Sequence, residues 1–199
     1  MLHADEVEND FVRVIHATQQ PHVKGAMHAH EFNRVLVYLD AADIVVTYAD
    51  GRQDPQHWKA GQAGWTPAGG MHTSENVGAR PVRVVEVEIK KGAPARMGVR
   101  NAALDPVALD PRHNVLLFEN AQVRVFRSWR EPGGSEKMHE HPAPDRVAVM
   151  LTDLDAQTKT DGAVTATHAS AGEAVWSGAV THAATNTGRR FEMIVIEVK

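Results

Sequence analysis

The chain has 199 residues, of which 43% are hydrophobic and 23% charged, a composition that suits one large or two small globular domains. Its net charge of -4 includes no long run of either sign, so nothing favours nucleic acid or an anionic membrane as a partner. The chain has no cysteine, which excludes disulfides, thiolate metal ligands and thiol nucleophiles.

The N-terminal segment, residues 1–8, is acidic and lacks the apolar core of a signal peptide. No apolar run in the sequence approaches the length of a membrane span. We therefore expect a cytoplasmic protein whose partner is a small molecule, and which is a monomer or a homodimer.

Strand signals follow in the first half of the chain. Short runs rich in β-branched and aromatic residues, bounded by Asp, Gly or Pro, predict strands over residues 34–39, 44–48 and 82–89. The dipeptide Asp50-Gly51 is typical of a hairpin turn. Residues 91–118 are broken by Pro94, Pro106 and Pro111, which favours an irregular crossover with one extra strand, and only residues 101–109 hint at a helix.

The second half of the chain repeats the first. Residues offset by 111 agree over much of the length, from Glu8-Asn9 and Glu119-Asn120 onward, and the offset falls to 110 and then 109 near the ends. The matching strands are predicted over residues 146–151, 164–168 and 191–198. We predict an all-β protein with a first unit at 1–95, a linker at 96–118 and a second unit at 119–199, each unit a small antiparallel barrel or jelly roll.

Three histidines recur in both units at matched positions. His28 and His30 lie two residues apart, as do His139 and His141, so each pair faces one side of a strand. A later histidine, His72 or His182, follows a turn and can return on a neighbouring strand. Three neutral imidazoles on one face are suited to a metal and leave coordination positions open for water, dioxygen or substrate.

A single histidine in a β protein is more often a surface or hydrogen-bonded residue than a ligand, but the repeat favours ligation here. Six of the 12 histidines fall at these matched positions. The remaining six are taken to have no histidine counterpart and to be structural: His3, His16, His22, His57, His113 and His168.

The spacing of these residues resembles the two motifs of the cupin superfamily, G(x)5HxH(x)3-4E(x)6G and G(x)5PxG(x)2H(x)3N. The first unit matches the second motif at every defined position: Gly61, Pro67, Gly69, His72 and Asn76. The second unit keeps Gly172, His182 and Asn186 of that motif, and has Gly133 six residues before His139. Two copies are similar to a bicupin, which implies two tandem cupin barrels, each with a divalent iron, manganese, nickel, copper or zinc ion inside.

The glutamate of the first motif, often a fourth metal ligand in the family, is missing from both units. Arginine stands at that point, Arg34 and Arg146, and a guanidinium cannot bind a cation. Counting forward from His141 places Asp145 at the glutamate position, so Asp145 is the candidate fourth ligand of the second unit. The resemblance with this departure implies centres formed by three histidines without glutamate.

Other residues near the motifs have two interpretations each. Arg34 and Arg146 either point inward and bind a carboxylate or enolate, which we favour slightly, or form ion pairs on the surface. Tyr38 is a further candidate for substrate binding if its strand is regular. Trp65 and Trp176 either pack in the barrel cores, which we favour, or serve as platforms on which substrate stacks. Met27, Met71 and Met138 are expected to face away from the histidines and pack in the core.

Three classes of function follow from this reading. The resemblance implies a metal-dependent enzyme acting on a small oxygenated or acidic molecule, with dioxygenase-like chemistry or, on the same centre, isomerase, lyase or decarboxylase chemistry. A non-catalytic binding or sensory module is the alternative, because fold does not determine function. A structural barrel with relict histidines is the third, and the retention of both triads argues against it.

Overall fold

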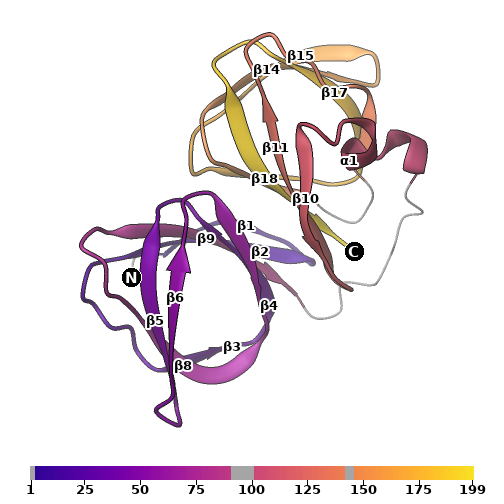
Figure 1. Ribbon diagram of the computed structural model, residues 1–199. Helices are drawn as coiled ribbons and strands as arrows, with labels where there is room; N and C mark the ends of the chain where they lie inside the picture. Colours follow the sequence, from indigo (N-terminus) through magenta and orange to yellow (C-terminus); the bar gives the residue numbers. More distant parts are fainter. Residues whose placement is uncertain (1–2, 91–100, 142–145) are drawn as a thin grey trace. The chain divides into compact units, whose positions relative to one another are not determined.

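A computed structural model describes residues 3–90, with side chains from Val7 onward, together with residues 101–141 and 146–199. It divides into two compact units, Met1–Lys91 and Gly92–Lys199. Strands dominate both units, and Figure 1 shows that in each unit they curve into a barrel-like arrangement. The predicted all-β fold of two tandem barrels is confirmed.

In the residues that the structure describes, the first unit has nine strands. They are β1 (His3–Glu8), β2 (Val12–Gln19), β3 (His28–His30), β4 (Asn33–Tyr38), β5 (Ala42–Tyr48), β6 (Gln53–Trp58), β7 (Gln62–Thr66), β8 (Gly69–Asn76) and β9 (Val82–Ile89). The strands form two antiparallel sheets in the orders β1-β2-β9-β4-β7 and β3-β8-β5-β6.

The described part of the second unit (residues 101–141 and 146–199) has nine matching strands, preceded by two short helices. The helices are η1 (Ala102–Leu104) and α1 (Pro106–Leu109), and the strands are β10 (Asn114–Glu119), β11 (Val123–Arg130), β12 (His139–His141), β13 (Arg146–Met150), β14 (Leu154–Thr160), β15 (Ala163–Ala169), β16 (Ala174–Ser177), β17 (Val180–Asn186) and β18 (Phe191–Val198). Their sheet orders, β10-β11-β18-β13-β16 and β12-β17-β14-β15, repeat those of the first unit strand for strand.

The predicted strands of both units appear within a residue or two of their expected positions. Residues 96–118, which the sequence analysis assigns to a linker, contain η1, α1 and β10 in their described part, and β10 pairs with β11 inside the second unit. The unit and linker boundaries themselves stay predictions. No helix of the described residues is long and apolar enough to cross a membrane, and the cytoplasmic location stays a prediction as well.

Alternation along the central strands explains how a polar site forms inside an apolar barrel. In β4, Arg34, Leu36 and Tyr38 line a cavity, whereas the intervening Val35 and Val37 are fully buried on the other face of the sheet. Because successive side chains of a strand point to opposite faces, valines can fill one face while the other keeps functional groups. Strands β2 and β9 follow the same rule.

The asparagine of the second motif holds the loops next to the barrel. The side-chain amide of Asn76 donates to the carbonyls of Gln19 and Arg80 and accepts from the backbone N–H of Gly78. Asn186 donates in the same way to the carbonyls of Arg130, Glu131 and Arg189 and accepts from Gly188. Both asparagines are buried, so the motif residue has a structural role in each unit.

The backbone conformation at the start of the first motif explains why the family pattern has a glycine there. Gly133 has a φ of 76°, in the left-handed region that glycine adopts without strain. His22 stands at the matching position of the first unit and adopts the same region, with a φ of 56°. The first unit therefore keeps the turn although it lacks the glycine.

Candidate metal centres

The first triad consists of His28, His30 and His72. As predicted, the third histidine returns on a neighbouring strand, because β3 pairs with β8 and His28 lies directly opposite His72. One ring nitrogen from each histidine lies within 4.8 Å of the others. The Nε2 atoms of His28 and His30 are 3.0 Å apart, as ligand atoms are around one metal ion.

The second triad, His139, His141 and His182, has the same construction. Strand β12 pairs with β17, and His139 lies opposite His182. The Nε2 atoms of His139 and His141 are again 3.0 Å apart, and the three ligand nitrogens meet the same 4.8 Å limit. The repeat detected in the sequence thus produces two triads of matching geometry.

Hydrogen bonds fix the tautomers of these rings. The Nδ1 atoms of His28, His72 and His139 each contact the carbonyl oxygen two residues earlier, at 2.7–2.8 Å. A carbonyl only accepts, so these Nδ1 atoms carry the proton and the Nε2 lone pairs face the centre of each triad. This donor arrangement fits a cation.

The hydrogen bonds of the second triad indicate a bound cation most strongly. His141 Nδ1 donates to Glu197 Oε1 at 2.8 Å, so in this tautomer the Nε2 atoms of His139 and His141 are both lone-pair donors. Two lone pairs 3.0 Å apart repel each other unless a proton or a metal ion lies between them. Metal binding would remove that repulsion.

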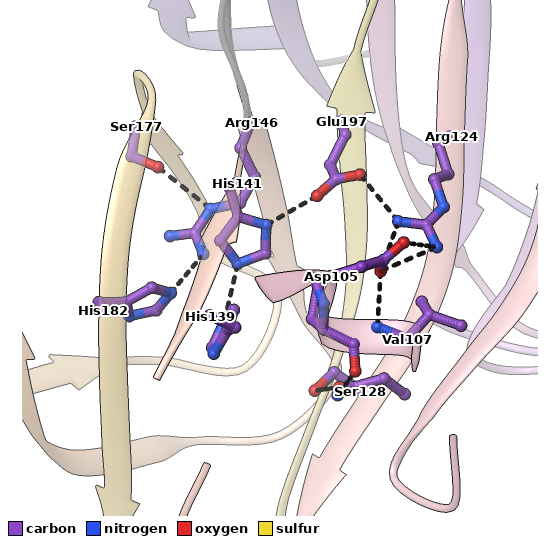
Figure 2. Close-up of polar contacts among 12 residues, drawn as sticks. Asp105, Val107, Arg124, Ser128, His139, His141, Arg146, Ser177, His182 and Glu197 are labelled. Carbon is purple, nitrogen blue, oxygen red and sulfur yellow. Dashed lines mark hydrogen bonds and ion pairs between the residues drawn. The ribbon is translucent and has the colours of Figure 1, made fainter. Parts of the chain in front are cut away.

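A buried chain of charged groups supports His141 (Figure 2). Glu197 Oε2 lies 3.4 Å from Arg124 Nη1, and Arg124 binds both carboxylate oxygens of Asp105 at 3.0–3.1 Å. Asp105 also accepts from Val107 N and caps α1. Glu197 and Arg124 are almost completely buried, so the orientation of His141 is tied to a segment that precedes the second barrel.

The first unit has a looser version of this chain. Glu88, the counterpart of Glu197, lies 3.7 Å from His30 Nδ1 and binds Arg13 at 2.6–2.8 Å. Burial raises the pKa of Glu88, but its interactions with His30 and Arg13 outweigh burial and lower the pKa overall. The Arg13 side chain is 35% exposed, against 7% for Arg124. Solvent therefore reaches the Glu88–Arg13 pair of the first unit more readily than the Glu197–Arg124 pair of the second.

The first triad opens into a cavity of about 850 Å³. Arg34, Tyr38 and Glu86 line the cavity together with the three histidines. Apolar side chains surround the rest of it, among them Ile15, Leu36, Ile44 and Val84. A small organic molecule could therefore lie against both the histidines and Arg34.

Arg34 is the most unusual residue of this cavity. Its side chain is only 6% exposed, and its Nε and Nη1 atoms have no hydrogen-bond partner among the described residues. Glu86 Oε2, 3.3 Å from Arg34 Nε, likewise lacks a hydrogen bond within that part of the chain. Burial lowers the pKa of Arg34, and a buried guanidinium with unused donors is costly unless a ligand satisfies it.

Arg146 occupies the matching position of the second unit and has different neighbours. Its Nη1 lies 3.3 Å from His182 Nε2, and its Nε donates to Ser177 Oγ at 3.1 Å (Figure 2). Burial, followed by electrostatic interactions with His139 and Arg146, lowers the pKa of His182 to about 2. Since Arg146 can only donate, it uses the lone pair with which His182 would bind a metal.

Tyr38 lies deeper in the first barrel. Its ring stacks on Trp58 with centroids 4.6 Å apart, and burial raises its pKa above the usual range. Tyr38 therefore keeps its hydroxyl proton at neutral pH. The counterpart in the second unit, Met150, is apolar and fully buried.

One carboxylate near the second triad was missed by the sequence analysis. Glu136 is buried, and its Oε2 lies 4.0 Å from His139 Nε2. Its position three residues before His139 corresponds to Gly25 in the first unit, so a comparison restricted to shared residues passes over it. Asp145, the predicted fourth ligand, lies outside the described residues.

The predictions for four other residues are wrong. Met27, Met71 and Met138 face away from the histidines but are 39–47% exposed, so they do not pack in a core. Trp176 is 45% exposed and lies on β16, an edge strand of its sheet, so it does not pack in the barrel core.

His57 and His168 do have each other as counterparts, which the sequence analysis did not recognise. Each lies directly opposite an aspartate in a hairpin, and each Nδ1 binds that aspartate, Asp43 or Asp155, at 2.7–2.8 Å. Both pairs are exposed to solvent, which agrees with a structural rather than a ligating role.

Comparison with solved structures supports the fold independently. A cupin 2 conserved barrel domain protein from Leptotrichia buccalis superimposes with a TM-score of 0.60 at 14% identity, covering 100% of this chain and 88% of that one. A variant of oxalate decarboxylase from Bacillus subtilis gives 0.65 at 12% identity, with 94% and 68% covered. A variant of salicylate 1,2-dioxygenase from Pseudoaminobacter salicylatoxidans gives 0.63 at 11% identity, with 94% and 71% covered.

No protein-family model and no curated protein matches the sequence. At these identities the structural likeness shows the fold alone. The chain is a cupin-fold protein of the bicupin type, with one histidine triad in each barrel.

Proposed function

We propose that this chain is a metal-dependent enzyme in which the first triad holds the catalytic metal and the adjoining cavity binds a small oxygenated or acidic molecule. The observation that carries the proposal is Arg34. Its nearly fully buried guanidinium lines the same cavity as three converging imidazoles. Among the described residues its Nη1 has no hydrogen-bond partner, and its Nε has only the ion pair with Glu86 at 3.3 Å. An anionic oxygen of a ligand would satisfy Arg34 while another oxygen reaches the metal.

The donor set supports a divalent transition metal. Iron, manganese, nickel, copper and zinc all bind imidazole, and three such ligands leave positions open for substrate or dioxygen. The bound metal would supply Lewis-acid polarisation of a substrate oxygen or activation of dioxygen. Two triads allow one metal in each unit.

The cavity also indicates what kind of molecule would fit. Arg34 offers N–H donors, and Glu86 Oε2 next to it offers an acceptor. A ligand with an anionic oxygen beside a hydroxyl would satisfy both residues, as a hydroxy acid or an enediol would. Apolar residues such as Leu36 and Ile44 would pack against its carbon skeleton. The names of two fold relatives, oxalate decarboxylase and salicylate dioxygenase, point to small acids as well.

Metal content tests the first half of this proposal. Elemental analysis of protein purified without an affinity tag, after anaerobic reconstitution with each candidate metal, should give two ions per chain. His28→Ala and His139→Ala should each retain one ion, since each variant removes a ligand from one triad only. Protein that takes up none of the five metals would overturn the proposal.

Ligand binding and turnover test the second half. Hydroxy acids, catechols and diketones should bind to metal-loaded protein and consume oxygen if the chemistry is dioxygenase-like. Arg34→Met should weaken binding of anionic ligands at least about tenfold while the metal content stays unchanged. Binding without any chemical change would favour the alternative of a non-catalytic or sensory cupin. Conversion without oxygen uptake would favour an isomerase, lyase or decarboxylase.

A further inference from the structure

Arg34 and Arg146 occupy matching positions in the two units but face different partners. Arg146 Nη1 lies 3.3 Å from His182 Nε2, the atom with which this histidine would bind a metal (Figure 2). Arg34 Nε lies instead 3.3 Å from Glu86 Oε2, and Arg34 Nε and Nη1 make no hydrogen bond within the described part of the chain. The same side chain therefore contacts a ligand atom in one unit and a carboxylate in the other.

One residue on the neighbouring central strand distinguishes these two surroundings. Strand β4 pairs with β9 and places Glu86 opposite Leu36, two residues after Arg34. Strand β13 pairs with β18 in the same register and places Val195 opposite Ala148. Val195 is buried and apolar. The second barrel therefore has no carboxylate at the point where the first barrel has the partner of its arginine.

No other group of the second barrel takes the place of this carboxylate. Glu136 and Glu197 attract Arg146 from further away, but each forms an ion pair with a different arginine. A guanidinium carries only donors, so Arg146 is left with the neutral acceptors within its reach, Ser177 Oγ and His182 Nε2.

The hydroxyl group does not explain the difference, because both units have one. Ser177 lies opposite Arg146, and Thr66 lies opposite Arg34. Thr66 also lines the cavity of the first unit. Arg34 nevertheless pairs with Glu86, which leaves the residue at position 86 or 195 as the difference that sets the direction of the arginine.

We propose that Glu86 is a positioning residue that holds Arg34 away from the ligand atom of His72. This inference rests on the proposed function, because it assumes that the first triad holds the catalytic metal. With Glu86 in place, His72 Nε2 stays available to the metal, and Arg34 stays available to an anionic ligand in the cavity. The carboxylate thus keeps two positive groups, the metal ion and the guanidinium, from competing for one lone pair.

The second unit has the arrangement that results without this carboxylate. A metal ion that binds the second triad has to displace Arg146 from His182 Nε2. The hydrogen bond that is lost involves a charged donor, which makes its displacement costly. The first centre should therefore fill at a lower metal concentration than the second.

Glutamine and valine at position 86 separate the position of Arg34 from the charge of Glu86. Glu86→Gln removes the charge but keeps an oxygen that accepts from Arg34, whereas Glu86→Val reproduces the second unit. In full-length His139→Ala, where only the first triad is complete, Glu86→Val should raise the dissociation constant for zinc(II) at least about tenfold, and Glu86→Gln should raise it less than about threefold. Competition with a chromophoric chelator measures both constants.

A rescue experiment identifies Arg34 as the cause of this loss. Adding Arg34→Met to Glu86→Val should restore the affinity for zinc(II), because no guanidinium then competes for His72. Equal effects of Glu86→Val and Glu86→Gln, or a loss that Arg34→Met does not reverse, would overturn the inference and leave the proposed function intact. Failure of the wild-type protein to bind any of the five candidate metals would instead overturn the proposed function.

Nitrogen-15 NMR of the metal-free chain reads the position of the arginines without any metal. With rings assigned from His72→Gln and His182→Gln, the wild-type Nε2 signal of His182 should have the shift of a hydrogen-bond acceptor, and that of His72 should not. In Glu86→Val the His72 signal should move to the acceptor shift. Acceptor shifts on both or on neither histidine of the wild-type protein would overturn the inference, and this result decides the question even if Glu86→Val does not fold.

Discussion

The two triads occupy equivalent positions on equivalent strands, but their surroundings differ. The first consists of half-buried histidines beside a cavity of about 850 Å³, where two Arg34 nitrogens have no hydrogen bond within the described part of the chain. In the second, His139 and His141 are buried, Arg146 contacts His182, and Phe126 stands where the first barrel has Ile15. The ring of Phe126 is parallel to His141 with centroids 6.2 Å apart.

This difference shows what the duplication has preserved and what has diverged. The strands and the histidines that hold the ligand geometry are shared, whereas the groups that control access and charge are not. Catalytic metal sites keep an open coordination position, and structural sites are closed by protein ligands. Under the proposed function, the first triad, which opens into the cavity, is therefore the centre expected to carry the chemistry.

The largest expected contrast concerns the carboxylates behind the triads. Glu197→Leu removes the partner of His141 and Arg124 in a fully buried network, and we expect a loss of about 3 kcal/mol or more in the second unit. Glu88→Leu should cost the first unit about 1 kcal/mol, because Arg13 is partly exposed and can return to water. Hydrogen exchange of peptides from each unit, measured against urea concentration, reads the two effects separately. Equal losses would refute the contrast.

The motif asparagines should show what the units share. Asn76→Ala leaves the carbonyls of Gln19 and Arg80 and the N–H of Gly78 without their partner, and Asn186→Ala does the same to its loop. Since each lost group is buried or half-buried, each variant should destabilise its own unit by about 2 kcal/mol. The same exchange experiment measures both. A large effect in only one unit would mean that the loops are not equivalent.

A third contrast concerns the arginine next to each triad. Arg146→Met removes a cation and frees the Nε2 lone pair of His182, so metal affinity of the second centre should rise about tenfold, or about 1.4 kcal/mol. Arg34→Met should change metal affinity of the first centre less, because Arg34 faces Glu86. Titrations in the His28→Ala and His139→Ala backgrounds compare the two. A loss of affinity in Arg146→Met would show that Arg146 supports the centre by holding its ligands in place.

The features that the two units share, their strands and their histidine triads, were predicted well from the sequence. Strand positions followed from β-branched runs bounded by turn residues, and the triads followed from a histidine pattern that recurs at an offset of 110 or 111. His57 and His168 were within reach of the same method, since they lie 111 residues apart.

The features that differ between the two units could not be predicted from the repeat. Glu136 has no counterpart in the first unit, so the repeat gives no signal for it. The burial of Arg34 and Arg146 was not fixed by local sequence, because it depends on strands far along the chain. Glu88 and Glu197 were matched by the repeat, but only the pairing of β4 with β9 and of β13 with β18 places them behind the triads.

The last expected contrast is a difference in acid sensitivity between metal-free units, which is small near neutral pH. His182, with a pKa lowered to about 2 mainly by burial, stays neutral in the folded protein, whereas an unfolded histidine takes up a proton near pH 6.5. The unfolded state therefore binds more protons as the pH falls below 6.5, and the second unit should lose up to about 1.4 kcal/mol of stability per pH unit from this residue. Burial lowers the pKa of His72 too, but this histidine lies beside the open cavity, so the first unit should lose less.

Proton NMR of the metal-free chain measures this directly, with ring signals assigned from His72→Gln and His182→Gln. We expect the His182 ring to remain neutral at pH 5, where the exposed His168, whose pKa its hydrogen bond with Asp155 raises, is already charged. In His182→Gln the acid-dependent loss of stability in the second unit should diminish, because the proton uptake on unfolding has been removed. A His182 titration near that of an unfolded histidine would show that water reaches the second centre as freely as the first.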